Sequence, residues 1–219
     1  YGVLHDVGRK VRDGETIAFG AHALAVIHTP GHTPGSTCFA LQGPRGALFS
    51  GDTLFRRSVG RTDLWGGDTD AILTSIRTRL FPLAALVTPN LPEAAALSGR
   101  PVRDLDEMKA VGNELARKFR TRFLLKGGHL TGDRAIDLLC DGKTVVEFSA
   151  PFVAGVSTHG TGCTYSAAIA ARLALGDPLP DAIARAKDFV SRAIREYFSW
   201  ATSLGEVHVL NHRPSDEHR

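Results

Sequence analysis

The hydrophobic pattern of the chain changes near residue 84, and this change constrains the fold more than any other feature. Before it, short apolar runs are separated by clusters of glycine, proline and aspartate, which is typical of strands joined by turns. After it, short strands alternate with amphipathic helices, which is typical of a layered α/β sheet. No polar linker separates the patterns, since Phe81-Pro82-Leu83 runs directly into Ala84. The sequence predicts two parts, residues 1–83 and 84–219.

In the first part we expect a small β-sheet followed by a helix. The strands are predicted at Thr16–Phe19, Leu24–Thr29, Thr37–Leu41 and Ala47–Ser50. The helix is predicted from Asp68, a suitable N-cap, to Leu80. Its apolar residues Ile72, Ile76 and Leu80 recur at the spacing of one helical face.

In the second part we expect strands and helices in alternation. The strands are predicted at Ala85–Val87, Phe123–Leu125, Ala135–Cys140 and Val145–Phe148. The helices are predicted at Leu105–Phe119, Thr164–Leu175 and from Asp181 to about Trp200.

Composition narrows the class of protein. Lys and Arg number 26 against 23 Asp and Glu, a balance too even for a nucleic-acid-binding surface. The apolar runs are far shorter than the roughly 20 residues of a membrane helix, so we expect no membrane span. The three cysteines form no CxxC pair, which favours a reducing, cytoplasmic compartment. Because the chain starts at Tyr1, we expect it to begin within a longer reading frame.

The first part contains two candidate metal ligands. His32 lies in a turn rich in proline and glycine, and Asp52 follows the end of a predicted strand. A histidine with an aspartate suits zinc or iron. With the segments 55–63 and 66–68, this region closely resembles the metallo-β-lactamase superfamily, nearest to the glyoxalase II and persulfide dioxygenase group.

This resemblance covers residues 1–83 and implies part of an αββα fold. His32 would match the family's third metal-binding histidine, and Asp52 the aspartate that binds or bridges the metals. The family's His-x-His-x-Asp-His cluster does not occur in this sequence. Two protein ligands do not hold a catalytic zinc. We therefore expect either metal-free residues hydrogen-bonded in turns, or a Zn²⁺ or Fe²⁺ site only if further ligands complete it.

The strongest local motif of the second part is the segment 157–164, Ser-Thr-His-Gly-Thr-Gly-Cys-Thr, followed by a helix of small residues. Glycines at a helix start allow backbone N–H groups to point at one spot, where the helix dipole adds positive charge. Such a site stabilises a transferring phosphoryl group. Cys163 lies in the first turn, where a thiolate is favoured. A tight connection with a buried cysteine is the alternative.

Four motifs occur in a fixed order: Thr88–Ala94, Leu124–His129, Asp137–Leu139 and Thr158–Cys163. Together they closely resemble the hydroxymethylpyrimidine/phosphomethylpyrimidine kinases of thiamine biosynthesis, in the ribokinase-like superfamily. The resemblance runs from about residue 82 to His212 and implies part of a ribokinase-like α/β sheet. It implies that Gly160, Thr161 and Gly162 form an anion hole and that Cys163 is the catalytic base.

The same resemblance implies a nucleotide site with a metal ion. Asn90 and Glu93 would position Mg²⁺ and phosphate through water, and Lys126 would lie beside the phosphates of ATP. Each has a simpler alternative: Asn90 and Glu93 could cap a short helix over Pro92–Leu97, and Lys126 could be an ordinary exposed lysine.

The leading hypothesis is ATP-dependent phosphorylation of a pyrimidine alcohol or its phosphate. The competing hypotheses are a metal-dependent hydrolase or dioxygenase and an inactive chimeric fusion. The kinase family's N-terminal half, which holds most pyrimidine contacts, does not occur in this sequence. Strands cut from a larger sheet leave open edges, so we expect exposed apolar surface, with homodimers or aggregates as the result.

Overall fold

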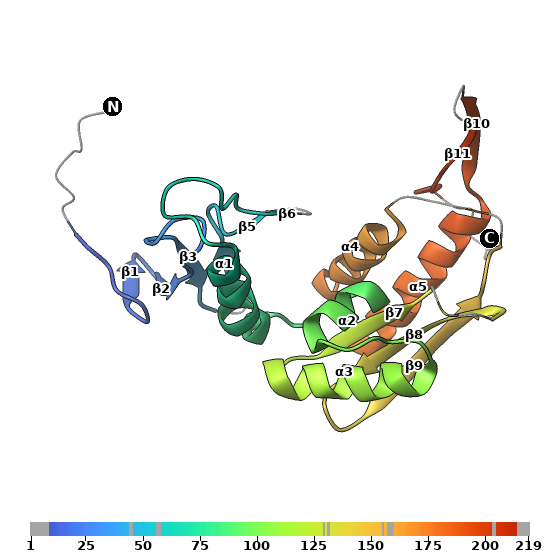
Figure 1. Ribbon diagram of the computed structural model, residues 1–219, viewed down its shortest axis with the longest axis horizontal. Coiled ribbons are helices and arrows are strands. Elements are labelled where there is room, and N and C mark those ends of the chain that lie inside the picture. The colour runs from blue at the N-terminus through green and yellow to red at the C-terminus, as the bar shows by residue number, and fades with distance from the viewer. Residues whose placement is uncertain are drawn as a thin grey trace. The chain divides into compact units, whose positions relative to one another are not determined.

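The computed structural model describes residues 9–43, 46–55, 58–128, 130, 132–154, 156, 160–202 and 205–213. The chain forms two compact units, Tyr1–Ala84 and Ala85–Arg219, and each is described by itself (Figure 1). Within the described residues, no helix combines the length and the apolar character needed to cross a membrane.

The first unit contains an antiparallel meander of β1 to β4. The strands are β1 (Thr16–Phe19), β2 (His22–His28), β3 (Thr37–Leu41) and β4 (Ala47–Phe49), hydrogen-bonded in chain order. They confirm the four predicted strands, with shifts of one or two residues at the ends of β2 and β4. A short hairpin of β5 (Leu54–Phe55) and β6 (Ser58–Val59) follows and was not predicted.

One helical segment packs against this sheet. It consists of α1 (Thr69–Ser75), a π-helical turn η1 (Ile76–Leu80) and a 3-10 turn η2 (Phe81–Leu83). As predicted, Asp68 is the N-cap, and its carboxylate accepts the N–H of Ala71 at 2.9 Å. The predicted apolar face is buried in one cluster with strand residues, namely Ile27, Cys38, Ile72, Ile76 and Leu80.

The second unit is built on an antiparallel sheet of β7 (Phe123–Gly127), β8 (Arg134–Cys140) and β9 (Val145–Pro151). The prediction of a strand over Ala85–Val87 is wrong, since no regular strand forms there. This stretch of chain contributes only isolated parallel bridges, Val87 to Phe123 and Asn90 to Lys126. Pro89 lacks a backbone N–H, which limits a regular ladder here.

Helices cover both faces of this sheet. They are α2 (Leu91–Ser98), α3 (Leu105–Phe119), α4 (Thr161–Ala174) and α5 (Leu179–Arg195). Adjacent residues of a strand point to opposite faces. Leu124 packs in one cluster with α4 and α5, whereas Leu125 lies against Gly112 of α3. The result is a three-layer α/β/α arrangement, with α3 on one side and α4 and α5 on the other (Figure 1).

The predicted end of the last helix is wrong. Helix α5 ends at Arg195, and the chain continues as a hairpin of β10 (Phe198–Thr202) and β11 (Gly205–Val209). Phe198 pairs with Val209 and Trp200 with Val207, so these four apolar side chains share one face. Aromatic residues at every second position favour a strand. This pattern begins after the helical pattern, which ends at Ile194.

Candidate functional site

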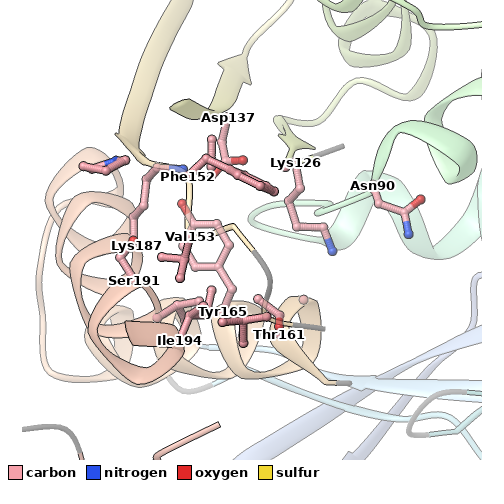
Figure 2. Close-up of a pocket in the computed structure, with 16 residues that line it drawn as sticks. Asn90, Lys126, Asp137, Phe152, Val153, Thr161, Tyr165, Lys187, Ser191 and Ile194 are labelled. Carbon is pink, nitrogen blue, oxygen red and sulfur yellow. Dashed lines mark hydrogen bonds and ion pairs between the residues drawn. The ribbon is translucent and has the colours of Figure 1, made fainter. Parts of the chain in front are cut away.

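A pocket of about 440 Å³ lies within the second unit, where the ends of the sheet strands meet α4 and α5 (Figure 2). Its apolar lining comes from the end of β9, the segment after it and α5, and includes Pro151, Phe152, Val153, Val156, Val190 and Ile194. Its polar lining includes Asn90, Lys126, Asp137, Thr161, Tyr165, Lys187 and Ser191. A concave site with apolar walls and few convergent polar groups is the usual form of a small-molecule site.

The first turn of α4 lines one end of this pocket. Gly160 is its N-cap with a φ of 88°, a left-handed conformation that favours glycine. Gly160 supplies no side-chain cap, and Thr161 and Gly162 line the pocket directly. Since the first N–H groups of a helix have no acceptor within it, this turn presents donors and the positive end of the dipole. The helix starts at Thr161, three residues earlier than predicted.

Lys126 brings a second positive charge to the same place. It lies near the end of β7, and its backbone N–H donates to the carbonyl of Pro89 at 2.9 Å. Its side chain reaches α4, since a Cβ built on Gly162 would be 2.9 Å from Nζ of Lys126. An ammonium group above a helix N-terminus forms an anion site, as the sequence predicted for Lys126 and the glycine-rich turn.

Of the other predicted site residues, Cys163 and Glu93 are not among those that line the pocket. Cys163 is exposed in the first turn of α4. Asn90 and Glu93 form a capping box on α2: the Asn90 side chain accepts the N–H of Glu93 at 2.8 Å, and Glu93 accepts the N–H of Asn90 at 2.7 Å. The simpler alternative for this pair is therefore present in the structure. Asn90 also lines the pocket, and Glu93 is exposed, with a second carboxylate oxygen that the cap does not use.

Three further polar residues of the pocket are buried: Lys187 and Tyr165 were missed by the sequence analysis, and Asp137 was part of a quoted motif but was assigned no role. Lys187 of α5 and Asp137 of β8 form an ion pair at 2.6 Å, and both are almost completely buried. The hydroxyl of Tyr165 is buried without a hydrogen-bond partner among the residues the structure describes. Burial raises the pKa of Tyr165, and the Asp137 carboxylate raises it further. A charged residue on an otherwise apolar helix face, as Lys187 is, was the available signal.

The two candidate metal ligands of the first unit also meet. Nε2 of His32 lies 3.7 Å from a carboxylate oxygen of Asp52, while Nδ1 shares a hydrogen bond with the carbonyl of Arg61 at 2.8 Å. A carbonyl on Nδ1 is a usual support for a metal-binding histidine. However, no three potential ligands cluster anywhere in the described part of the chain. Two donors do not fit a catalytic zinc or iron centre, so no chemistry is derived from them.

Several motif residues quoted above lie outside the described residues. They are Arg56, Arg57, His129 and the segment 157–159.

Comparison with known families agrees with the geometry of the second unit. The phosphomethylpyrimidine kinase family matches residues 68–208. The chain belongs to this family. The metallo-β-lactamase superfamily matches residues 2–97, so the two matches overlap over 68–97. Both resemblances inferred from sequence motifs are confirmed.

Several curated proteins are similar to this chain. The chain is 46% identical over 138 residues to the thiamine biosynthesis bifunctional protein ThiED of Geobacter sulfurreducens, covering 63% of this chain and 27% of that protein. It is 38% identical over 144 residues to the hydroxymethylpyrimidine/phosphomethylpyrimidine kinase of Aquifex aeolicus, covering 66% and 55% respectively. The chain thus spans about half the length of the single-function kinases it matches.

Solved structures confirm the ribokinase-like part of the predicted fold. A pyridoxal kinase of Bacillus subtilis in an ADP complex matches with a TM-score of 0.58 and 33% identity, covering 65% of this chain and 55% of that chain. The pyridoxal kinase of Staphylococcus aureus with AMP-PCP and pyridoxal matches with a TM-score of 0.59 and 32% identity, covering 66% and 53% respectively.

Proposed function

We propose that residues 84–219 form the ATP-binding C-terminal half of a hydroxymethylpyrimidine/phosphomethylpyrimidine kinase, and that residues 1–83 are a metallo-β-lactamase-like fragment. The observation that carries the kinase proposal is the meeting of Lys126 with the glycine-rich start of α4 at one end of an apolar-walled pocket. A nucleotide has the matching chemistry, with an anionic phosphate chain and a flat base that favours apolar walls.

The phosphates of ATP would bind at the cationic end of the pocket. Lys126 and the N–H groups at Thr161 and Gly162 would stabilise the negative charge that develops as the γ-phosphoryl group moves. The base would lie between Phe152 and Ile194, at the apolar end. The pocket would thus supply positioning and electrostatic stabilisation, which are the main protein contributions to phosphoryl transfer.

In the proposed reaction, Cys163 accepts the proton of the attacking substrate hydroxyl. The acceptor oxygen bonds to the γ-phosphorus of ATP, the bond to the β–γ bridging oxygen breaks, and ADP leaves with that electron pair. The proton transfer to Cys163 applies to the hydroxymethyl acceptor, since a phosphate acceptor attacks through an oxygen that is already ionised. Cys163 lies in the first turn of α4, directly after Gly162 of the anion site, which suits a group that accepts this proton. The exposed thiol would persist in a reducing cytoplasm, where we place the activity.

Members of this family use a divalent metal, and we propose Mg²⁺ held at Asn90 and Glu93. Their side chains cap α2, which leaves one carboxylate oxygen of Glu93 to contact the ion through water. This fits Mg²⁺, which keeps several waters in nucleotide sites. The ion would neutralise charge on the phosphates.

The test is ATP consumption by the purified chain with hydroxymethylpyrimidine, its monophosphate or pyridoxal as acceptor. We expect turnover with a pyrimidine acceptor that is lost in Cys163→Ala. A preference for pyridoxal would instead indicate that the chain shares the substrate of the pyridoxal kinases that it resembles in structure. Nucleotide binding without turnover by any acceptor would restrict the proposal to a nucleotide-binding half.

A second copy of this chain is the protein partner we propose. Exposed apolar side chains on one face of the β10–β11 hairpin, including Phe198 and Trp200, favour self-association. Sedimentation velocity over a range of concentrations should show a dimer, and a double change of Phe198 and Trp200 to Ser should weaken it. A monomer at every concentration would rule this partner out.

A further inference from the structure

The ion pair between Lys187 and Asp137 is a buried part of the pocket lining. The Lys187 ammonium lies 2.6 Å from one carboxylate oxygen of Asp137, and the two residues are 7% and 4% exposed. Removing two charges from water is costly, and replacing a buried pair by apolar residues often leaves stability unchanged or improved. Stability alone therefore gives no reason for placing this pair here.

Asp137 is also the direct neighbour of Lys126. The two residues face each other across β7 and β8, so their side chains project from the same face of the sheet, and both line the pocket. The second carboxylate oxygen of Asp137 accepts the N–H of Gly127, the residue after Lys126, at 3.1 Å. The Asp137 carboxylate thus contacts the backbone of β7 at the residue that follows Lys126.

Despite this proximity, Lys126 is not paired with Asp137. Among the described residues no carboxylate forms an ion pair with Lys126, and its side chain is directed towards α4 (Figure 2). The reason lies in the pairing of Asp137: one of its oxygens faces Lys187 and the other faces the Gly127 N–H. Each carboxylate oxygen thus already accepts one hydrogen bond, and the negative charge is balanced by the Lys187 ammonium.

We propose that Lys187 is a positioning residue that keeps Lys126 available for an anionic ligand. By neutralising Asp137, it removes the carboxylate that would otherwise draw the Lys126 ammonium away from α4. Asp137 in turn fixes the Gly127 peptide and the direction in which Lys126 leaves β7. This inference rests on the proposed nucleotide site. It adds to that site a buried ion pair, Lys187 with Asp137, that favours binding of the phosphate groups of the ligand.

The test compares ADP with adenosine, which lacks the phosphates, by calorimetry. Lys187→Met leaves Asp137 charged and should weaken ADP binding about ten-fold while adenosine binding stays the same, the size expected for one charge-assisted contact. Asp137→Asn/Lys187→Met removes the competing charge and keeps an acceptor for Gly127, so ADP affinity should recover. Lys187→Arg should behave as the parent protein. A purely structural pair would change the affinities for ADP and adenosine equally, and this result would overturn the proposal.

A second readout does not require nucleotide binding. Limited acetylation followed by mass spectrometry should show Lys126 less reactive in Lys187→Met than in the parent chain, with exposed Lys143 as the internal reference. Absence of ADP binding in the parent would reject the proposed nucleotide site. Unchanged Lys126 reactivity would reject the positioning role, so the two failures are distinguishable.

Discussion

Lys126 and Gly162 are in close approach: a Cβ built on Gly162 would lie 2.9 Å from Nζ of Lys126. This relationship joins the end of β7 to the first turn of α4 and places an ammonium charge at a helix N-terminus. It also explains why a residue without a side chain stands at position 162. Any larger residue there would compete with Lys126 for the same space.

Gly162→Ala should therefore weaken ADP binding with little effect on folding. The new methyl group displaces the mobile end of Lys126 rather than backbone, so the fold is preserved, while the ammonium is moved from the anion site. We expect a loss of about three- to ten-fold in ADP affinity, a fraction of a charge-assisted hydrogen bond, with adenosine unaffected. Calorimetry measures both affinities.

Gly128→Ala is the matched control for this change. Gly128 lines the same pocket, but a Cβ there meets no atom within 4 Å. It should bind ADP as the parent chain does. Equal affinities in the Gly162 and Gly128 variants would show that Lys126 does not need this space to bind the ligand.

Native-state thiol labelling should modify Cys163 alone. Cys163 is exposed, whereas Cys38 and Cys140 are buried in their strands. Burial raises the pKa of the Cys140 thiol to about 12, so it carries no thiolate at neutral pH. A chromogenic disulfide reagent should therefore release one equivalent of its chromophore per native chain and three equivalents per denatured chain. Cys163→Ala should release none before denaturation; rapid release from that variant would show that a buried cysteine is accessible.

Local sequence patterns predicted most of the elements because apolar periodicity and capping are local properties. Asp68 starts α1, and α3 has the predicted bounds, since Asp104 caps it and an apolar face runs along it. The C-terminal hairpin was missed because its apolar residues follow a helix without a glycine or proline between them. A change of period from 3.6 to 2 within a few residues gives too few positions to identify.

The site was predictable where the residues lie in one segment and unpredictable where they meet across the fold. The turn at Gly160–Gly162 could be read from its glycines and the helix after it. The pairing of Asp137 with Lys187 could not, since 50 residues separate them in the sequence. Only the packing of α5 on the sheet brings them together, and a single sequence does not record which helix face meets which strand.

The turn between β8 and β9 should lose stability in acid through Asp141. Its carboxylate accepts the N–H groups of Thr144 and Lys143 and the hydroxyl of Thr144 at 2.7–2.8 Å. These bonds lower its pKa from 3.8 to about 2. The ionised form is thus favoured by folding, so its contribution is complete above pH 3.8 and is lost as the pH falls through about 2.

Urea unfolding of the parent chain and of Asp141→Asn at a series of pH values tests this. The difference in unfolding free energy between them should be constant from neutral pH to about 4, close to the ordinary aspartate pKa, and should shrink between 4 and 2. Asp63, whose pKa is also lowered to about 2, titrates in both proteins and cancels from the difference. A difference in unfolding free energy that does not change with pH would show that ionisation of Asp141 does not contribute to stability.

Tyr165 allows the cost of an unpartnered hydroxyl to be separated from the packing of its ring. The ring belongs to the cluster between the sheet, α4 and α5 and is 5% exposed, while the hydroxyl has no partner among the described residues. Because burial raises its pKa, the hydroxyl stays neutral at working pH, and removing it changes no charge. Tyr165→Phe should therefore leave stability unchanged or raise it by up to about 1 kcal/mol. Tyr165→Ala, which also removes the ring, should cost about 3–5 kcal/mol through the cavity it leaves. Urea unfolding measures both, and a loss of more than about 1 kcal/mol in the Phe variant would mean that the hydroxyl forms a hydrogen bond in solution.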